Sequence, residues 1–137
     1  MKLYQHNLIY LVRGKVTELI KIGQTKVDIE QRVKELQIGS PDILEVIAVT
    51  FEPHTSENEL HNKFSEYRKH GEWFLPSEDI LEYVKQHCFK NISLAYSAYN
   101  EINSGRLSYE EAVSMKDDVL IKLCRESPKN EIHGYTI

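Results

Sequence analysis

Apolar residues follow two different spacings along residues 1–90, and together these spacings predict both strands and helices. Residues 8–12 and 19–23 are short runs of aliphatic and β-branched residues separated by a polar stretch, so they predict a β-hairpin. Residues 43–51 form a third aliphatic run and predict a third strand. The first half of the chain therefore supplies the strands of one small sheet.

Three further segments carry apolar residues every three or four positions, which is typical of amphipathic helices. The first starts near Asp28 and ends at Gly39, the second covers residues 56–69 with Ser56 as N-cap, and the third starts at Ser77. The order is strand, strand, helix, strand, helix, helix. This order predicts an α+β fold with a small three-stranded antiparallel or mixed sheet flanked by helices.

The pattern becomes purely helical after Asn91, where two amphipathic segments are separated by a break at Asn103-Ser104-Gly105. Ser108 and Glu111 have the spacing of a capping box at the start of the second segment. We expect a domain over residues 1–90, a helical hairpin over 91–126 and a mobile tail over 127–137. The hairpin could fold back on the domain, form a homodimer or bind a protein partner.

Several polar residues border the apolar faces of these elements. If the first hairpin is symmetric about Lys15 and Val16, Tyr10 lies opposite Lys21 on one face of the sheet. On the helix over residues 56–69, Glu57 and His61 are one turn apart beside the apolar stripe. Glu59 is about 200° around the same helix and should face water.

The ordered set Leu8-Ile9-Tyr10, Lys21-Ile22-Gly23, Arg32 and Glu57 resembles the GIY-YIG nuclease superfamily. Leu60-His61 and Gly71-Glu72-Trp73-Phe74 resemble its phage-encoded branch, which is related to the meiotically up-regulated fungal proteins. The resemblance covers roughly residues 7 to 87 and implies a phage or mobile-element endonuclease that cleaves DNA. Leu8 and Lys21 depart from the superfamily pattern, and an Asn that many members carry after the catalytic Glu has no clear counterpart.

The resemblance also implies a role for each residue in a magnesium- or manganese-dependent reaction. Glu57 would be the single protein ligand of one Mg²⁺ or Mn²⁺ ion, and Arg32 would grip the phosphate oxygens. Tyr10 would take a proton from the attacking water, which requires that Lys21 or Arg32 lower the pKa of the phenol. His61 would support the carboxylate or contact the phosphate.

Each of these residues also has a purely structural interpretation. Trp73 and Phe74 are predicted as core residues, with Glu72 at most a supporting group. The structural alternatives for the candidate site are a core Tyr10, a solvated Lys21, an Arg32 paired with Asp28 or Glu35, a Glu57 that favours the helix dipole, and a rim His61.

The charge and the cysteines limit the possible functions. The formal net charge is −4 and the pI about 5.9, which argues against the broad basic surface of a protein that binds DNA without sequence preference. Cys88 and Cys124 lack metal-ligand spacing and are expected to be reduced thiols. With no apolar leader or membrane span in the sequence, we expect a cytoplasmic protein without a membrane partner.

Two functions from different classes therefore remain open. One is a divalent-metal-dependent endonuclease acting on DNA. The other is a module of the same fold that binds nucleic acid or a protein partner and cleaves little or nothing. The presence of a phenol, a guanidinium and a carboxylate that would converge on one cleft favours the endonuclease. The net negative charge and the missing Asn favour the binding module.

Overall fold

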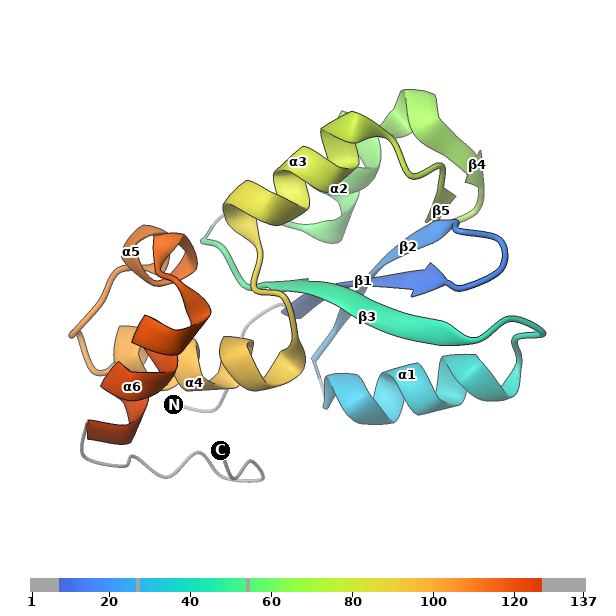
Figure 1. Ribbon diagram of the computed structural model, residues 1–137. Helices are drawn as coiled ribbons and strands as arrows, with labels where there is room; N and C mark the ends of the chain where they lie inside the picture. Colours follow the sequence, from blue (N-terminus) through green and yellow to red (C-terminus); the bar gives the residue numbers. More distant parts are fainter. Residues whose placement is uncertain (1–7, 27, 54, 127–137) are drawn as a thin grey trace.

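A computed structural model describes residues 8–26, 28–53 and 55–126, and over these residues the chain has an α+β fold (Figure 1). A five-stranded sheet has the order β3-β1-β2-β5-β4, and every neighbouring pair is antiparallel. The sheet is larger than the three strands predicted. Its strands are β1 (Leu8–Gly14), β2 (Ile20–Thr25), β3 (Leu44–Thr50), β4 (Arg68–His70) and β5 (Trp73–Phe74).

Helices cover both faces of this sheet (Figure 1). α2 and α3 lie over one face, α1 and α4 lie over the other, and α5 and α6 pack at one end beside α4. None of the helices in the described ranges is both long and apolar enough to cross a membrane. The helices are α1 (Ile29–Ile38), α2 (Glu57–Lys63), α3 (Glu78–His87), α4 (Ile92–Asn103), α5 (Tyr109–Ser114) and α6 (Asp117–Glu126), with a 3-10 turn η2 (Ser65–Tyr67).

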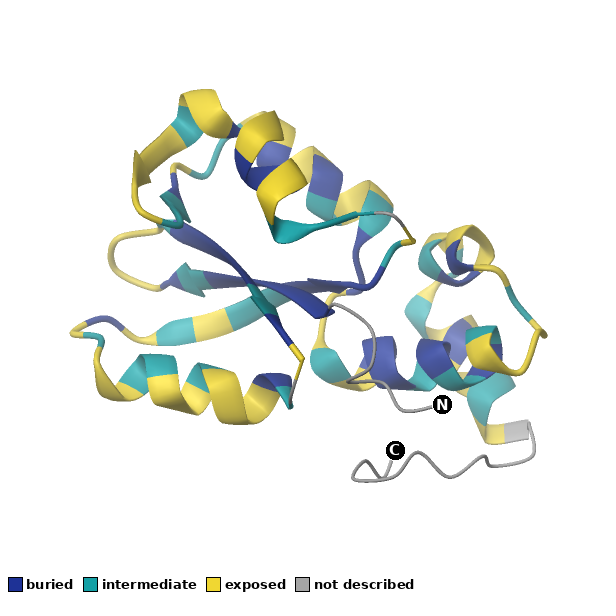
Figure 2. Cartoon of the chain, turned by 180° about the vertical axis from the view of Figure 1, so that it is seen from behind, coloured by how far each residue is buried: buried dark blue, intermediate teal, exposed yellow. Residues whose placement is uncertain are grey.

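The alternation of side chains along β1 and β2 divides the interior into two cores. Ile9 and Leu11 face α2 and α3, whereas Leu8, Tyr10 and Val12 face α1 and α4. Figure 2 shows that both strands are buried along almost their whole length. Each fully buried aliphatic side chain contributes roughly 1.5–3 kcal/mol, so these central strands hold the helices of both layers in place.

The register of the first hairpin differs from the one predicted. Tyr10 lies opposite Gly23 rather than Lys21, because the connection is centred on Val16 and Thr17. The Asp42 carboxylate fixes this loop by accepting hydrogen bonds from the backbone N–H groups of Val16 and Thr17, at 3.0 Å each. A shift of two residues preserves the faces, so Tyr10 and Lys21 still lie on the same side of the sheet.

The helix predicted over residues 56–69 is shorter than expected. Ser56 caps it as predicted, but α2 ends at Lys63, and Arg68 belongs to strand β4. The chain turns back at Gly71, whose φ of 52° is unfavourable for other residues, and β5 then pairs with β2. This small β4–β5 hairpin lacks a long alternating run, so the apolar pattern did not reveal it.

The predicted C-terminal hairpin contains three helices instead of two. The capping box of Ser108 and Glu111 is present, but the helix stops at Met115, where ψ is 147°, and α6 begins two residues later. Acidic residues in the first turn of α6 favour this new start. The predicted tail over residues 127–137 lies outside the described residues.

Tyr109 on α5 fastens the C-terminal helices to the sheet. Its hydroxyl donates a hydrogen bond to the His87 carbonyl (2.6 Å) and lies 2.7 Å from the Thr50 hydroxyl. Its ring packs edge-on against Phe51 and Phe89, with centroids 5.1 and 5.4 Å away. The C-terminal helices therefore fold back on the sheet, which was one of the three arrangements left open.

We predict that Gly23→Ala destabilises the protein by about 1–3 kcal/mol, because its Cβ would lie 2.5 Å from the buried Tyr10 ring. Urea unfolding measures the effect. Gly39→Ala is the matched control, since its Cβ would meet nothing closer than 4.0 Å, and it should change stability by less than about 0.5 kcal/mol. Equal stability of the two variants would contradict the described packing of Tyr10 on Gly23.

Candidate functional site

The candidate site lies where strand β5 stops pairing with β2. β5 pairs with Ile20 and Lys21 of β2. The next residue of β2, Ile22, points its backbone N–H and carbonyl toward the same side, where β5 has ended. The Ile22 N–H donates to the Glu72 carbonyl (3.1 Å), and the Ile22 carbonyl is 2.9 Å from Nε2 of His61. A side chain from α2 therefore takes the place of a neighbouring strand at this edge.

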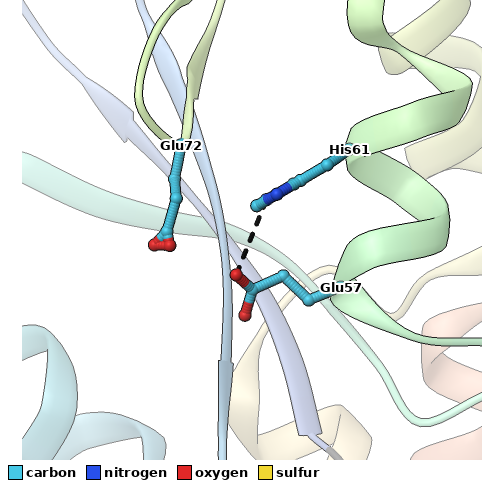
Figure 3. A group of neighbouring side chains, drawn as sticks. All are labelled: Glu57, His61 and Glu72. Carbon is cyan, nitrogen blue, oxygen red and sulfur yellow. Dashed lines mark ion pairs between the residues drawn. The ribbon is translucent and has the colours of Figure 1, made fainter.

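This arrangement brings residues from α2 and from the β4–β5 turn together. The backbone N–H of Glu57 donates to the side-chain oxygen of Gln24 on β2 (3.1 Å), which fixes the first turn of α2 against the sheet. One potential ligand atom from each of Glu57, His61 and Glu72 lies within 4.8 Å of the other two. Figure 3 shows these three side chains converging on one space.

Hydrogen bonds determine how His61 is oriented. The Arg68 guanidinium donates to Nδ1 of the imidazole (3.3 Å), so Nε2 carries the ring proton and donates it to the Ile22 carbonyl. Nε2 is 3.8 Å from the Glu57 carboxylate (Figure 3). His61 is buried, and its lone pair faces Arg68, so it supports the two carboxylates rather than binding a metal ion beside them.

The two carboxylates differ in their electrostatic surroundings. Burial and the negative charge of Glu72 raise the pKa of Glu57. Burial acts to raise the pKa of Glu72, but the Lys21 ammonium, 2.9 Å away, together with a hydrogen bond to Glu57 and the charge of His61, outweighs burial and lowers that pKa overall. Glu72 is therefore the more readily ionised member of the pair, and Lys21 holds it in that state.

This donor set fits a hard divalent cation. Two neighbouring carboxylates repel each other, and a bound cation would relieve that repulsion while oxygen ligands suit Mg²⁺ or Mn²⁺. The expected site had Glu57 as its one protein ligand, whereas the structure adds Glu72 beside it. The two carboxylates could hold such an ion together.

Tyr10 and Arg32 form the second half of the site. The Tyr10 hydroxyl is hydrogen-bonded to the Arg32 guanidinium, and Glu57 and Glu72 are close enough to act electrostatically on the phenol. Burial outweighs the effect of Arg32 and raises the pKa of Tyr10. The expectation of a lowered phenol pKa is therefore wrong, because the ring is buried.

Arg32 lies at the open side of the cluster. Its side chain is 44% exposed and is 3.7 Å from Glu35, so the ion pair with Glu35 that was the structural alternative is present together with the contact to Tyr10. An exposed pair of this kind is worth well under 1 kcal/mol, which leaves the guanidinium available for a substrate phosphate. The five predicted site residues are thus linked to one another or to Glu72 by contacts or electrostatic interactions.

The importance of Glu72 was underestimated from the sequence, where it was taken as at most a supporting group, whereas Arg68 was already noted beside Glu57 and His61. Glu72 contacts Lys21 across 51 positions of the chain, and Arg68 contacts His61 from a strand that was predicted as helix. Both contacts depend on the pairing of β5 with β2. The Gly71-Glu72 turn was the available signal, since a carboxylate beside a glycine turn can point into a cleft.

We predict that His61→Ala destabilises the protein by about 1–3 kcal/mol, because the buried Ile22 carbonyl loses its hydrogen-bond partner. Chemical unfolding followed by circular dichroism measures the effect. His70→Ala is the control: His70 is exposed, and its loss should cost less than about 0.5 kcal/mol. A His61→Ala variant as stable as the control would exclude the bridging role assigned to this imidazole.

In a comparison with known protein families, the model of the T5orf172 domain matches residues 7–89. The expected membership of the GIY-YIG nuclease superfamily is therefore wrong, since the matching model describes a different domain family. No curated protein and no solved structure matches the chain. The matched segment contains every residue of the candidate site, and α4, α5 and α6 lie beyond it.

Proposed function

The chain belongs to the T5orf172 domain family, and we propose that its carboxylate cluster makes it a divalent-metal-dependent endonuclease that hydrolyses DNA phosphodiester bonds. The observation that carries this proposal is that Glu57 and Glu72 lie beside each other and act electrostatically on Tyr10, whose hydroxyl is bonded to Arg32. A structural role alone does not require two carboxylates, a phenol and an exposed guanidinium at the same place.

In this proposal each side chain has a separate task. Glu57 and Glu72 hold the cation, and Lys21 keeps Glu72 ionised. Arg32 grips two oxygens of the scissile phosphate through its planar guanidinium. When bound, Mg²⁺ or Mn²⁺ would offset the negative charge that develops on the phosphate oxygens during cleavage.

Tyr10 accepts a proton from the attacking water at its phenolic oxygen. Only the phenolate can do so, and the raised pKa makes this form rare near neutral pH. The hydrogen bond from Arg32 favours the phenolate and partly compensates for burial. His61 positions Glu57 and does not itself contact the substrate in this scheme.

Cleavage assays with purified protein and either supercoiled plasmid or single-stranded DNA test the proposal, with Mg²⁺ or Mn²⁺ present. We expect Glu57→Gln, Glu72→Gln and Arg32→Lys each to lower the cleavage rate by about 100-fold or more. Glu59→Gln is the matched control, because Glu59 lies in the same helical turn but is exposed. It should cleave within about twofold of the wild-type rate. Equal loss in all four variants, or no metal-dependent cleavage by the wild type, would refute the assignment.

The pH dependence of cleavage tests the role of Tyr10. Because its pKa lies above the usual 10.0, the phenolate fraction should rise about tenfold per pH unit across the neutral and mildly alkaline range. We expect the rate to follow this rise in the wild type and not in Tyr10→Phe. A wild-type rate that stays flat over the same range would remove Tyr10 as the proton acceptor.

A binding module without cleavage is the second candidate, and one observation favours it. The positive charge of Lys21 is directed at Glu72, so it does not activate the buried phenol. Such a module would bind DNA or a protein partner through the same surface. DNA binding that depends on Arg32, without cleavage under any metal condition, would favour this candidate.

A further inference from the structure

A cavity of about 500 Å³ lies beside the carboxylate cluster. It is bounded by the β1–β2 loop, the end of α1, the start of β3 and the β4–β5 hairpin, and this size is within the usual range for small-ligand pockets. Lys21 lines the cavity and also bonds Glu72, so the cavity and the candidate site share a wall. A ligand in the cavity would therefore lie next to the proposed cleavage point.

The walls of the cavity are mainly apolar, and Trp73 is its largest side chain. Trp73 is opposite Lys21 in the β5–β2 pairing, so both side chains lie on the same face of the sheet. It was predicted as a core residue, but it is only partly buried and belongs to neither hydrophobic core. An aromatic surface is thus left open toward the cavity, with Leu19, Leu36 and Leu44 among the other walls.

The two acidic groups at the cavity are held differently. The Asp42 carboxylate accepts hydrogen bonds from the loop backbone and from the Thr17 hydroxyl, whereas Glu35 makes only an exposed contact with Arg32 at 3.7 Å. Lys21 and His70 add cationic or hydrogen-bonding groups. These surroundings suit a flat, uncharged ring attached to a phosphate chain better than they suit a free anion.

The rim of the cavity carries three strongly exposed aliphatic residues, each a chain neighbour of a lining residue. Val16 is 83% exposed, Ile38 88% and Ile43 60%. Val16 and Ile43 are close together, because the loop N–H groups and the Ile43 N–H all bond Asp42. Apolar side chains at such a mouth can pack against an unstacked base step, as wedge residues do in other DNA-binding proteins.

We propose that this cavity binds one unpaired nucleobase of the DNA substrate, stacked on Trp73, next to the phosphodiester bond that is cleaved. The inference rests on the proposed function and adds a substrate class to it: single-stranded DNA or DNA with an unpaired nucleotide. A base inside a duplex is stacked on both faces and cannot enter the cavity unless it is first flipped out. Stacking on an aromatic ring tolerates any base, so the cavity selects for strandedness rather than for sequence.

Trp73 is the one tryptophan of the chain, so its fluorescence reports directly on the cavity. The measurement uses full-length Glu57→Gln protein without divalent metal, so that bound DNA stays intact. The probes are a single-stranded oligothymidine, a duplex of equal length and a single strand with abasic positions. We expect saturable quenching with the oligothymidine and little or none with the other two.

Substitutions at Trp73 supply a second readout through the affinity of labelled single-stranded DNA. Trp73→Leu should weaken binding of the single strand by about tenfold and leave the duplex unchanged, while Trp73→Phe, which keeps an aromatic face, should retain most of the affinity. Circular dichroism confirms that each variant is folded. Unchanged affinity in a folded Trp73→Leu variant, or equal quenching by duplex and single strand, would overturn the proposal.

The two proposals can fail independently. Metal-dependent cleavage by the wild type, with Trp73 fluorescence unaffected by single-stranded DNA, would refute the base-binding cavity and leave the nuclease intact. Quenching by single-stranded DNA without any cleavage would support the cavity and refute hydrolysis.

Discussion

The arrangement of the site depends on the backbone of Ile22, whose N–H and carbonyl both point to the edge of β2 that β5 leaves open. A backbone pair buried without partners costs several kcal/mol, so this edge must be closed. The Ile22 N–H donates a hydrogen bond to the Glu72 carbonyl, and the His61 imidazole donates one to the Ile22 carbonyl. Satisfying one strand edge therefore brings α2 and the β4–β5 turn together, and with them the two carboxylates.

The positions of the charged side chains Lys21 and Arg68 follow from these hydrogen bonds to Ile22. Lys21 directly precedes Ile22 and bonds Glu72, and Arg68 bonds the ring of His61. Each cation thus has a partner that fixes its direction. Arg32 differs, because its side chain is partly exposed while it contacts the buried Tyr10. The site consequently has a firmly held inner side and one cation at its open side.

The sequence was sufficient for the elements with strong local signals. The strands over residues 8–12, 19–23 and 43–51, the cap at Ser56 and the capping box at Ser108 all agree with the structure. The predicted register of the first hairpin was wrong because Asp42, which is distant in sequence, fixes the loop. The β4–β5 hairpin and the helix break at Met115 were not predicted, because they depend on tertiary pairing and packing.

The same distinction holds for the site. Tyr10, Lys21, Arg32, Glu57 and His61 could be chosen from their order along the chain, but the family named from that order was wrong. The pKa of Tyr10 could not be predicted, since it depends on how deeply the ring is buried against Gly23. Glu72 was undervalued because its contact with Lys21 exists only after β5 has paired.

The ring cluster around Tyr109 also limits how this domain can be moved between proteins. The family match ends at residue 89, yet Phe51 and Phe89 are covered by Tyr109 from α5. A graft that stopped at the end of the match would carry these two rings uncovered into its new host, where they would promote aggregation. A transplantable unit must therefore include α4 and α5, or replace them with an apolar cover of similar shape.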